Sequence, residues 1–267
     1  VILGSRTGAT LSNVGYQPIV YKTTNSGSTW SLEPPIDFNS AAYADVKRPL
    51  RTVETDSLLE VPYFWNNEGM DCIVDKNNKL HIFATITGHF SNSVDSMTFY
   101  STLQPEGYIW NHIPGFRPYL YDFTYDGSTS LWSHTTIDSL SSECPGRAST
   151  QGGYQENPWD GDPNNSNSKL ASGARLQMRR TPDGAYIVYT YAESDTTTTT
   201  QAKKWNSLPN VKARVLNVNT GVLHPLELNI TKFKNGVSGA PASIADRSLF
   251  HMTSPKCRVA STNIANG

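Results

Sequence analysis

The sequence predicts an all-β protein built from repeated four-stranded antiparallel units. Short segments rich in β-branched and aromatic residues alternate with turns that contain Gly, Asn or Asp. Helical periodicity is nearly absent over the 267 residues. A hairpin pattern, in which a turn with glycine is followed by a new strand, also recurs along the chain. Recurrence of this kind indicates a repeat architecture.

Two stretches of the chain can be superposed strand by strand, because in each a hairpin is followed by two further strands. The expected strands are 70–75, 80–86, 97–103 and 108–113 in the first unit, and 174–180, 185–193, 211–218 and 222–228 in the second. Each unit spans about 45 to 55 residues, which is typical of a blade of a β-propeller. We therefore expect a single β-propeller domain, or a fragment of one, over residues 1–267.

Partial units account for most of the remaining sequence, at 17–34, 119–137 and 248–261. This makes about five recognisable units, and we expect about six to eight blades in the intact domain. Long loops, which do not have the pattern of blade strands, are expected near 39–58, 145–172 and 194–209.

One turn in the first partial unit has a well-defined pattern, made by Thr23, Asn25, Gly27, Thr29 and Trp30. The Asn25 carboxamide can bind backbone N–H groups two residues on, and Gly27 can adopt a positive φ without strain. Thr29 and Trp30 then begin the returning strand. We expect the large indole of Trp30 to be buried between strands.

This turn resembles the Asp-box, or BNR repeat, whose pattern is Ser/Thr-x-Asp-x-Gly-x-Thr-Trp, with Asn25 in place of the usual Asp. The resemblance implies a sialidase-like β-propeller, in which the motif joins the third and fourth strands of a blade. In that family the motif lies at the blade periphery, away from the ligand face.

Composition and charge exclude several functions. Charged residues make up 17% of the chain, the net charge is −1, and Lys and Arg are scattered along the sequence without a basic stripe, so nucleic acid is not an expected partner. No apolar run approaches the roughly 18 to 20 residues that a membrane helix needs, so membrane insertion is not expected. The chain also lacks the short motifs of metalloproteases, α/β-hydrolases and nucleotide-binding proteins.

The cysteines and histidines form no metal-binding pattern. Cys72 is expected to be a buried free thiol, and a disulfide between Cys144 and Cys257 is one alternative for the other two. His81 alternates with apolar residues in a strand and is interpreted as a hydrogen-bonded structural residue. His89 follows a strand end and is the better candidate for a site on a loop face.

The loop near 145–172 is the candidate binding loop. Tyr154 and Trp159 can stack on a sugar or fill a partner's pocket, and Asp160 and Asp162 can hydrogen-bond hydroxyl groups. Asp160, Asp162 and Asn164 also place oxygen atoms at alternate positions, as in a calcium loop. A solvated turn without metal is the favoured interpretation, calcium is the alternative, and no other cofactor is expected.

An enzymatic alternative is implied by the Asp-box resemblance, because that motif is commonest in sialidases. These exo-glycosidases need three arginines to bind a carboxylate, a tyrosine activated by a glutamate, and an acidic aspartate. The candidate arginines are Arg6, Arg51, Arg117, Arg175 and Arg214. Phe116-Arg117-Pro118 is similar to the family's Phe/Tyr-Arg-Ile-Pro but lacks the Ile, and a turn between blades is the preferred interpretation.

A second resemblance rests on the hairpin 70–86, the block 174–195 and the strand 211–218. These segments are similar to large secreted proteins of Bacteroidetes that carry a propeller and a type IX secretion sorting domain. Candidate O-glycosylation sites of the type used in that phylum are Ser57, Ser96, Ser139 and Thr196.

Together the resemblances imply a secreted or cell-surface location, and a glycan, cell-surface or secretion-machinery protein as partner. A non-catalytic extracellular β-propeller module is the first functional hypothesis. An exo-sialidase or related glycoside hydrolase is the alternative, and a purely structural spacer is the third possibility.

Overall fold

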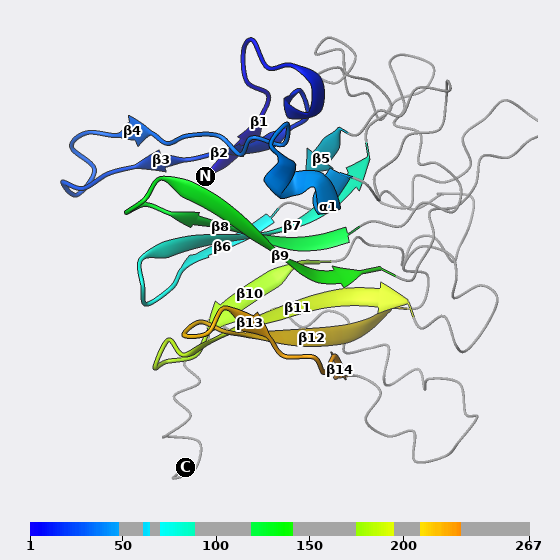
Figure 1. Ribbon diagram of the computed structural model, residues 1–267. Coiled ribbons are helices and arrows are strands. Elements are labelled where there is room, and N and C mark those ends of the chain that lie inside the picture. Colours follow the sequence, from blue (N-terminus) through cyan, green and yellow to red (C-terminus); the bar gives the residue numbers. More distant parts are fainter. Residues whose placement is uncertain (48–60, 65–69, 89–118, 141–174, 195–208, 231–267) are drawn as a thin grey trace, which may run out of the picture.

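The structure is a computed structural model that describes residues 1–47, 61–64, 70–88, 119–140, 175–194 and 209–230 (Figure 1). These residues are mostly β and all strand pairs are antiparallel, which confirms the predicted class. The strands are β1 (Ile2–Gly4), β2 (Gln17–Ile19), β3 (Tyr21–Lys22), β4 (Ser31–Leu32), β5 (Pro62–Phe64), β6 (Met70–Val74), β7 (Lys79–Gly88), β8 (Tyr119–Asp126), β9 (Leu131–Ser139), β10 (Gln177–Arg180), β11 (Tyr186–Ser194), β12 (Pro209–Asn217), β13 (Val222–Leu223) and β14 (Leu228–Asn229). The described helical segments are short: η1 (Leu11–Asn13), η2 (Ala41–Tyr43) and α1 (Ala44–Lys47).

The first large sheet, called the first sheet below, contains β5 to β9 with β7 at its centre. Both β5 and β6 pair with one edge of β7, β8 pairs with its other edge, and β9 pairs with β8. The prediction had assigned 97–103 as the strand next to the 70–86 hairpin and 119–137 to a separate unit. That assignment was wrong, because β8 occupies this edge of β7. Residues 97–103 and 108–113 lie outside the described residues.

The second large sheet, the second sheet, agrees more closely with the prediction. Its order is β10-β11-β12-β13, and β14 also pairs with β12. The turn between β10 and β11 is closed by Gly184, whose φ is 68°, and by the Asp183 carboxylate, which accepts the Ala185 N–H at 3.0 Å. The single fourth strand predicted at 222–228 is instead divided into β13 and β14. Pro225 lies between them and has no N–H for a strand ladder.

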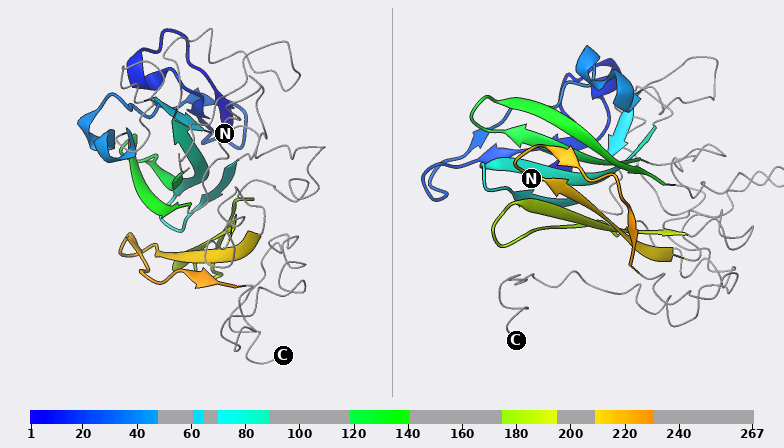
Figure 2. Two further views of the ribbon diagram at one scale, coloured as in Figure 1. Left: turned by 90° about the vertical axis from the view of Figure 1, so that its right-hand side faces the viewer. Right: turned by 60° about the horizontal axis from the view of Figure 1, so that its bottom comes forward.

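The two sheets pack face to face, as the two views of Figure 2 also show. Their common core contains Phe83, Leu120 and Ile137 from the first sheet and Ile187 and Tyr189 from the second. The Phe83 and Tyr189 rings meet edge to face, with centroids 5.1 Å apart. Alternate residues on each strand point to opposite faces, so this core uses one face of each sheet.

The opposite face of the first sheet is covered by the N-terminal segment. Ile36, Phe38 and Val46 from this segment pack against Ile82 and Phe123 of the sheet. The Phe38 and Phe123 rings meet at 90° with centroids 5.9 Å apart. The first sheet is therefore a central layer with apolar contacts on both faces.

Edge strands of the two sheets also contact one another. The Asp71 carboxylate on β6 accepts hydrogen bonds from the Met178 N–H at 2.7 Å and from Arg179 Nη1 at 3.1 Å. Arg180 Nη1 donates to the Val74 carbonyl at 2.8 Å. Strands β6 and β10 therefore lie side by side, although more than 100 residues separate them in the sequence.

The turn that resembles an Asp-box, called the Asp-box turn below, joins β3 and β4. The Asn25 carboxamide accepts the Thr29 N–H at 2.9 Å, the Thr23 hydroxyl accepts the Gly27 N–H at 2.9 Å, and Gly27 has a φ of 90°. Trp30, however, is 60% exposed, so its predicted burial was wrong. Its indole N–H donates to the Gly27 carbonyl at 3.1 Å, and the ring therefore covers its own turn.

Cys72 on β6 is a free thiol, as predicted, but it is half-buried rather than buried. Burial raises the pKa of this thiol to about 11, which keeps it protonated and unreactive at neutral pH. Cys144 and Cys257 lie outside the described residues, so a disulfide between them stays a prediction.

Candidate functional site

The strands of both sheets connect differently at their two ends. At the turn end, neighbouring strands are joined by tight turns, such as 75–78 in the first sheet and 181–185 in the second. At the loop end, β7 stops at Gly88 and β8 starts at Tyr119, while β11 stops at Ser194 and β12 starts at Pro209. Long connections between well-ordered strands are where binding and catalytic residues are concentrated.

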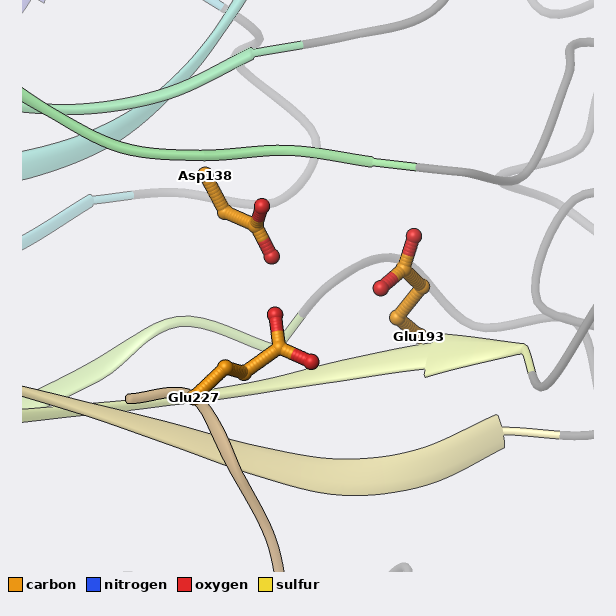
Figure 3. Close-up of side chains that lie close together, drawn as sticks. All are labelled: Asp138, Glu193 and Glu227. Carbon is orange, nitrogen blue, oxygen red and sulfur yellow. The ribbon is translucent and has the colours of Figure 1, made fainter. Parts of the chain in front are cut away.

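A group of charged and polar side chains gathers between the two sheets at the loop end (Figure 3). It consists of Asp138 on β9, Tyr191 and Glu193 on β11, Lys212 on β12, and Glu227 just before β14, and is called the carboxylate cluster below. Carboxylate oxygens of Asp138, Glu193 and Glu227 all lie within 4.8 Å of one another. Asp138 comes from the first sheet and the other members come from the second.

Hydrogen bonds connect every member of the carboxylate cluster. The Tyr191 hydroxyl donates to Asp138 Oδ2 at 2.5 Å and its oxygen lies 3.0 Å from Glu227 Oε2. The Lys212 ammonium donates to Glu193 Oε2 and lies 2.9 Å from Glu227 Oε1. Lys212 thus pairs with two of the three carboxylates, and Asp138 joins the cluster through Tyr191 and Glu227.

Burial and the crowding of negative charge change the pKa values in this cluster. Burial, together with the neighbouring Glu227 carboxyl, raises the pKa of Asp138 to about 7. Burial alone would also raise the pKa of Glu227, but hydrogen bonds with Asp138 and Lys212 lower it. The pKa of Tyr191 is raised by burial and by Asp138, so its hydroxyl stays protonated.

A second polar network lies deeper between the sheets, and its members are Asp75, His81, Asp122 and Tyr189. His81 Nδ1 lies 2.6 Å from Asp122 Oδ2 and His81 Nε2 lies 3.3 Å from Asp75 Oδ2. The Tyr189 hydroxyl donates to Asp122 Oδ2 at 2.5 Å. All of them are buried, which confirms that His81 is a hydrogen-bonded structural residue. This buried histidine network is closed to ligands.

Local sequence explains how the buried histidine network is built. Asp75 ends β6, and its Oδ1 accepts the N–H groups of Asn77 and Lys79 at 2.8 and 2.9 Å, which closes the turn to β7. Its second oxygen is then free to reach His81. Burial lowers the pKa of His81, but the Asp122 and Asp75 carboxylates outweigh it and the net direction is upward.

A groove of about 620 Å³ lies at the turn end, between β3 and the turns of the first sheet. Its charged side chains already have partners. Lys22 Nζ donates to the Gly127 carbonyl at 3.1 Å, and Asp126 pairs with Lys79 at 3.2 Å. The carboxylate cluster is the stronger candidate site, because it has more negative than positive groups and lies where the long connections leave the sheets.

Most residues predicted for function lie outside the described residues. These are the binding-loop residues Tyr154, Trp159, Asp160, Asp162 and Asn164, together with His89, Arg51, Arg117, Ser57, Ser96 and Thr196. Ser139 is described and exposed at the end of β9. The Asp138 carboxylate beside it points between the sheets, and Leu140 is buried in the core.

The arginines that the enzymatic alternative requires are only partly described. Arg6 Nη2 donates to the Glu33 carbonyl and Arg214 Nη2 to the His224 carbonyl, at 3.4 and 3.3 Å. Arg175 is exposed just before β10. The arginine clamp on a substrate carboxylate therefore stays a prediction.

The sequence reasoning missed the carboxylate cluster. One signal was present, because Tyr189, Tyr191 and Glu193 alternate along a predicted strand and so lie on one face of it. A glutamate in phase with buried tyrosines needs a charged partner. That partner, Lys212, lies on the next strand of the sheet, beyond a connection of 14 residues (195–208).

Comparison of the chain with models of protein families, with curated proteins and with solved structures found no match. Within the described residues, no helix has the length and apolar character needed to cross a bilayer.

Proposed function

We propose that the chain is an extracellular β-propeller module, or part of one, that binds a glycan without catalysing a reaction, with a protein partner as the alternative. The main support for this proposal is the way in which the two sheets pack against each other. Both are antiparallel and pack face to face, and their edge strands β6 and β10 lie side by side. Neighbouring blades arranged around a central channel have these features.

Binding is assigned to the loop end. The sheets hold the ends of the long connections in place, and the connection that contains Tyr154 and Trp159 begins directly after β9 and Leu140. Aromatic rings stack on the apolar faces of sugars, and carboxylates and amides bind their hydroxyl groups. The Asp-box turn lies at the other end of the strands, which agrees with a structural role for that motif.

A glycan array with matched tryptophan variants tests this proposal. We expect Trp159→Ala to reduce the affinity for the bound glycan at least tenfold, which corresponds to roughly 1.4 kcal/mol. Trp30→Ala is the control, because it removes an exposed indole at the turn end. Equal losses in the two variants, or an unchanged affinity in Trp159→Ala, would contradict a glycan site on this loop. Binding of no glycan by the folded protein would favour the protein partner.

One observation favours the enzymatic alternative. The Tyr191 hydroxyl contacts both Glu227 and Asp138, and a sialidase uses these three residue types. A tyrosine nucleophile must lose its proton easily, however, and the environment of Tyr191 raises its pKa. We therefore rank glycoside hydrolysis second.

Turnover assays with sialosides and aryl glycosides distinguish the two functions. The proposal predicts no saturable hydrolysis by the purified protein. Hydrolysis that is lost in both Tyr191→Phe and Glu227→Gln, while Tyr186→Phe remains active, would replace it with the enzymatic alternative. Tyr186 lies on the same strand but is exposed at the turn end.

A further inference from the structure

The carboxylate cluster is also a joint between the two sheets. Asp138 is its one member from the first sheet, and its carboxyl contacts Tyr191 and Glu227 of the second. The contact lies near the ends of β9 and β11, where long connections leave both sheets. A change that weakens this contact would therefore separate the two sheets first at the loop end.

The charges and protons in the carboxylate cluster show which interaction connects the two sheets there. Three ionised carboxylates and the Lys212 ammonium would leave an excess of two negative charges in a half-buried space. The Tyr191 hydroxyl has a single hydrogen, yet it lies within hydrogen-bond distance of oxygens from both Asp138 and Glu227. A further proton on one of these two carboxyl groups completes the hydrogen bonds and removes part of the repulsion.

We propose that Asp138 and Glu227 share one proton, and that this proton joins the two sheets at the loop end and loosens them when it leaves. The groups that face Asp138 are Tyr191 and Glu193 from β11 and Glu227 from the segment before β14. Lys212 from β12 pairs with Glu193 and Glu227. Lys212 stays protonated because Glu193 and Glu227 outweigh the effect of its burial and raise its pKa. The joint therefore responds to the proton on the carboxyl pair.

The direction of the pH effect follows from linkage. The pKa of Asp138 is about 7 in the folded protein, against roughly 3.9 in an unfolded chain. Between these values the folded state holds a proton that the unfolded state has released, so the stability of the joint falls as the pH rises. The loss is complete once the pH has passed about 7.

Thermal unfolding of the full chain at several pH values between 5.5 and 8.5 tests the proposal. Asp138→Asn keeps a neutral, hydrogen-bonding side chain of the same shape. We expect its melting temperature to rise relative to the wild type by at least about 3 °C between the two ends of this range. The control is Asp126→Asn at the turn end, where hydrogen bonds from Ser128 lower the aspartate's pKa to about 2. Its difference from the wild type should not change with pH.

Other titrating groups cancel in these differences, because the wild type and both variants contain them. A difference between Asp138→Asn and the wild type that stays constant from pH 5.5 to 8.5 would overturn the proposal. If Asp138→Asn does not fold, Glu227→Gln serves instead, because it removes the carboxyl partner of Asp138. A pH dependence as steep in Glu227→Gln as in the wild type would equally overturn it.

Discussion

Tyr189→Phe tests whether the buried histidine network holds the two sheets together. Asp122 is fully buried, and its Oδ2 atom accepts hydrogen bonds from Tyr189 and His81. Its Oδ1 atom is buried without a hydrogen-bond partner among the described residues. Removing the tyrosine hydroxyl would therefore leave His81 as the principal donor to a buried carboxylate.

The expected cost can be worked out from this arrangement. A phenylalanine ring keeps the edge-to-face contact with Phe83, so little packing is lost. The lost hydrogen bond is made to a charged group, for which the net contribution is roughly 1.5 to 3 kcal/mol. We expect the free energy of unfolding to fall by about 1.5 to 3 kcal/mol and the melting temperature by about 3 to 12 °C.

Urea denaturation measures this change, and the m-value should be unaltered because the fold exposes the same surface. The control is Tyr186→Phe on the same strand, whose side chain is 42% exposed and whose change should stay within about 0.5 kcal/mol. In a protein that already contains Asp122→Asn, Tyr189→Phe should reduce the free energy of unfolding by less, because the Tyr189 hydroxyl no longer donates to a carboxylate. A Tyr189→Phe variant as stable as Tyr186→Phe would show that the Tyr189 hydroxyl does not stabilise the buried Asp122 carboxylate.

Other predictions concern the hairpins, the core and the response to pH. Gly27→Ala should destabilise the protein by about 1 to 2 kcal/mol in denaturant unfolding, because Gly27 has a φ of 90°, which alanine rarely adopts. The cost comes from the backbone and not from a clash, since an added Cβ would lie 3.9 Å from the nearest Trp30 atom. Trp30→Ala should cost less than about 1 kcal/mol in the same assay, because the indole is mostly exposed; a larger loss would show that Trp30 packs elsewhere. Phe83→Ala should cost roughly 3 to 5 kcal/mol, because it opens a cavity between the sheets. The raised pKa of His81 predicts a contribution to stability that is fully present below about pH 6.5 and is lost as the pH rises through the folded pKa; an NMR titration of the His81 ring that shows a lowered pKa would contradict it.

The hairpins were predictable from the sequence because the residues that determine each turn lie next to one another in the chain. The turns Thr181-Pro182-Asp183-Gly184 and Asn217-Val218-Asn219-Thr220-Gly221 contain the residues that their backbone conformations require, and strands of alternating polarity flank them. These two hairpins give the pairs β10-β11 and β12-β13, whereas β11 pairs with β12 across the connection 195–208. The all-β class and the conformation of Gly27 were predictable for the same reason.

The pairing of β7 with β8 was not predictable, because a 30-residue connection (89–118) separates the two strands and other segments competed for that edge. The exposure of Trp30 was also missed. Sequence shows that an indole is large and apolar, but whether another layer covers it depends on the rest of the fold. The indole instead satisfies its N–H on the Gly27 carbonyl.

The candidate site depended most on tertiary structure. The alternating pattern of residues 185–193 was enough to place Tyr191 and Glu193 on one strand and on the same face of it. Only the packing of the two sheets brought Asp138 from the first sheet against Tyr191 and Glu227 of the second. Charges and pKa values respond to distance and burial, which no local pattern encodes, so the proton-sharing pair emerges only when strands distant in sequence meet.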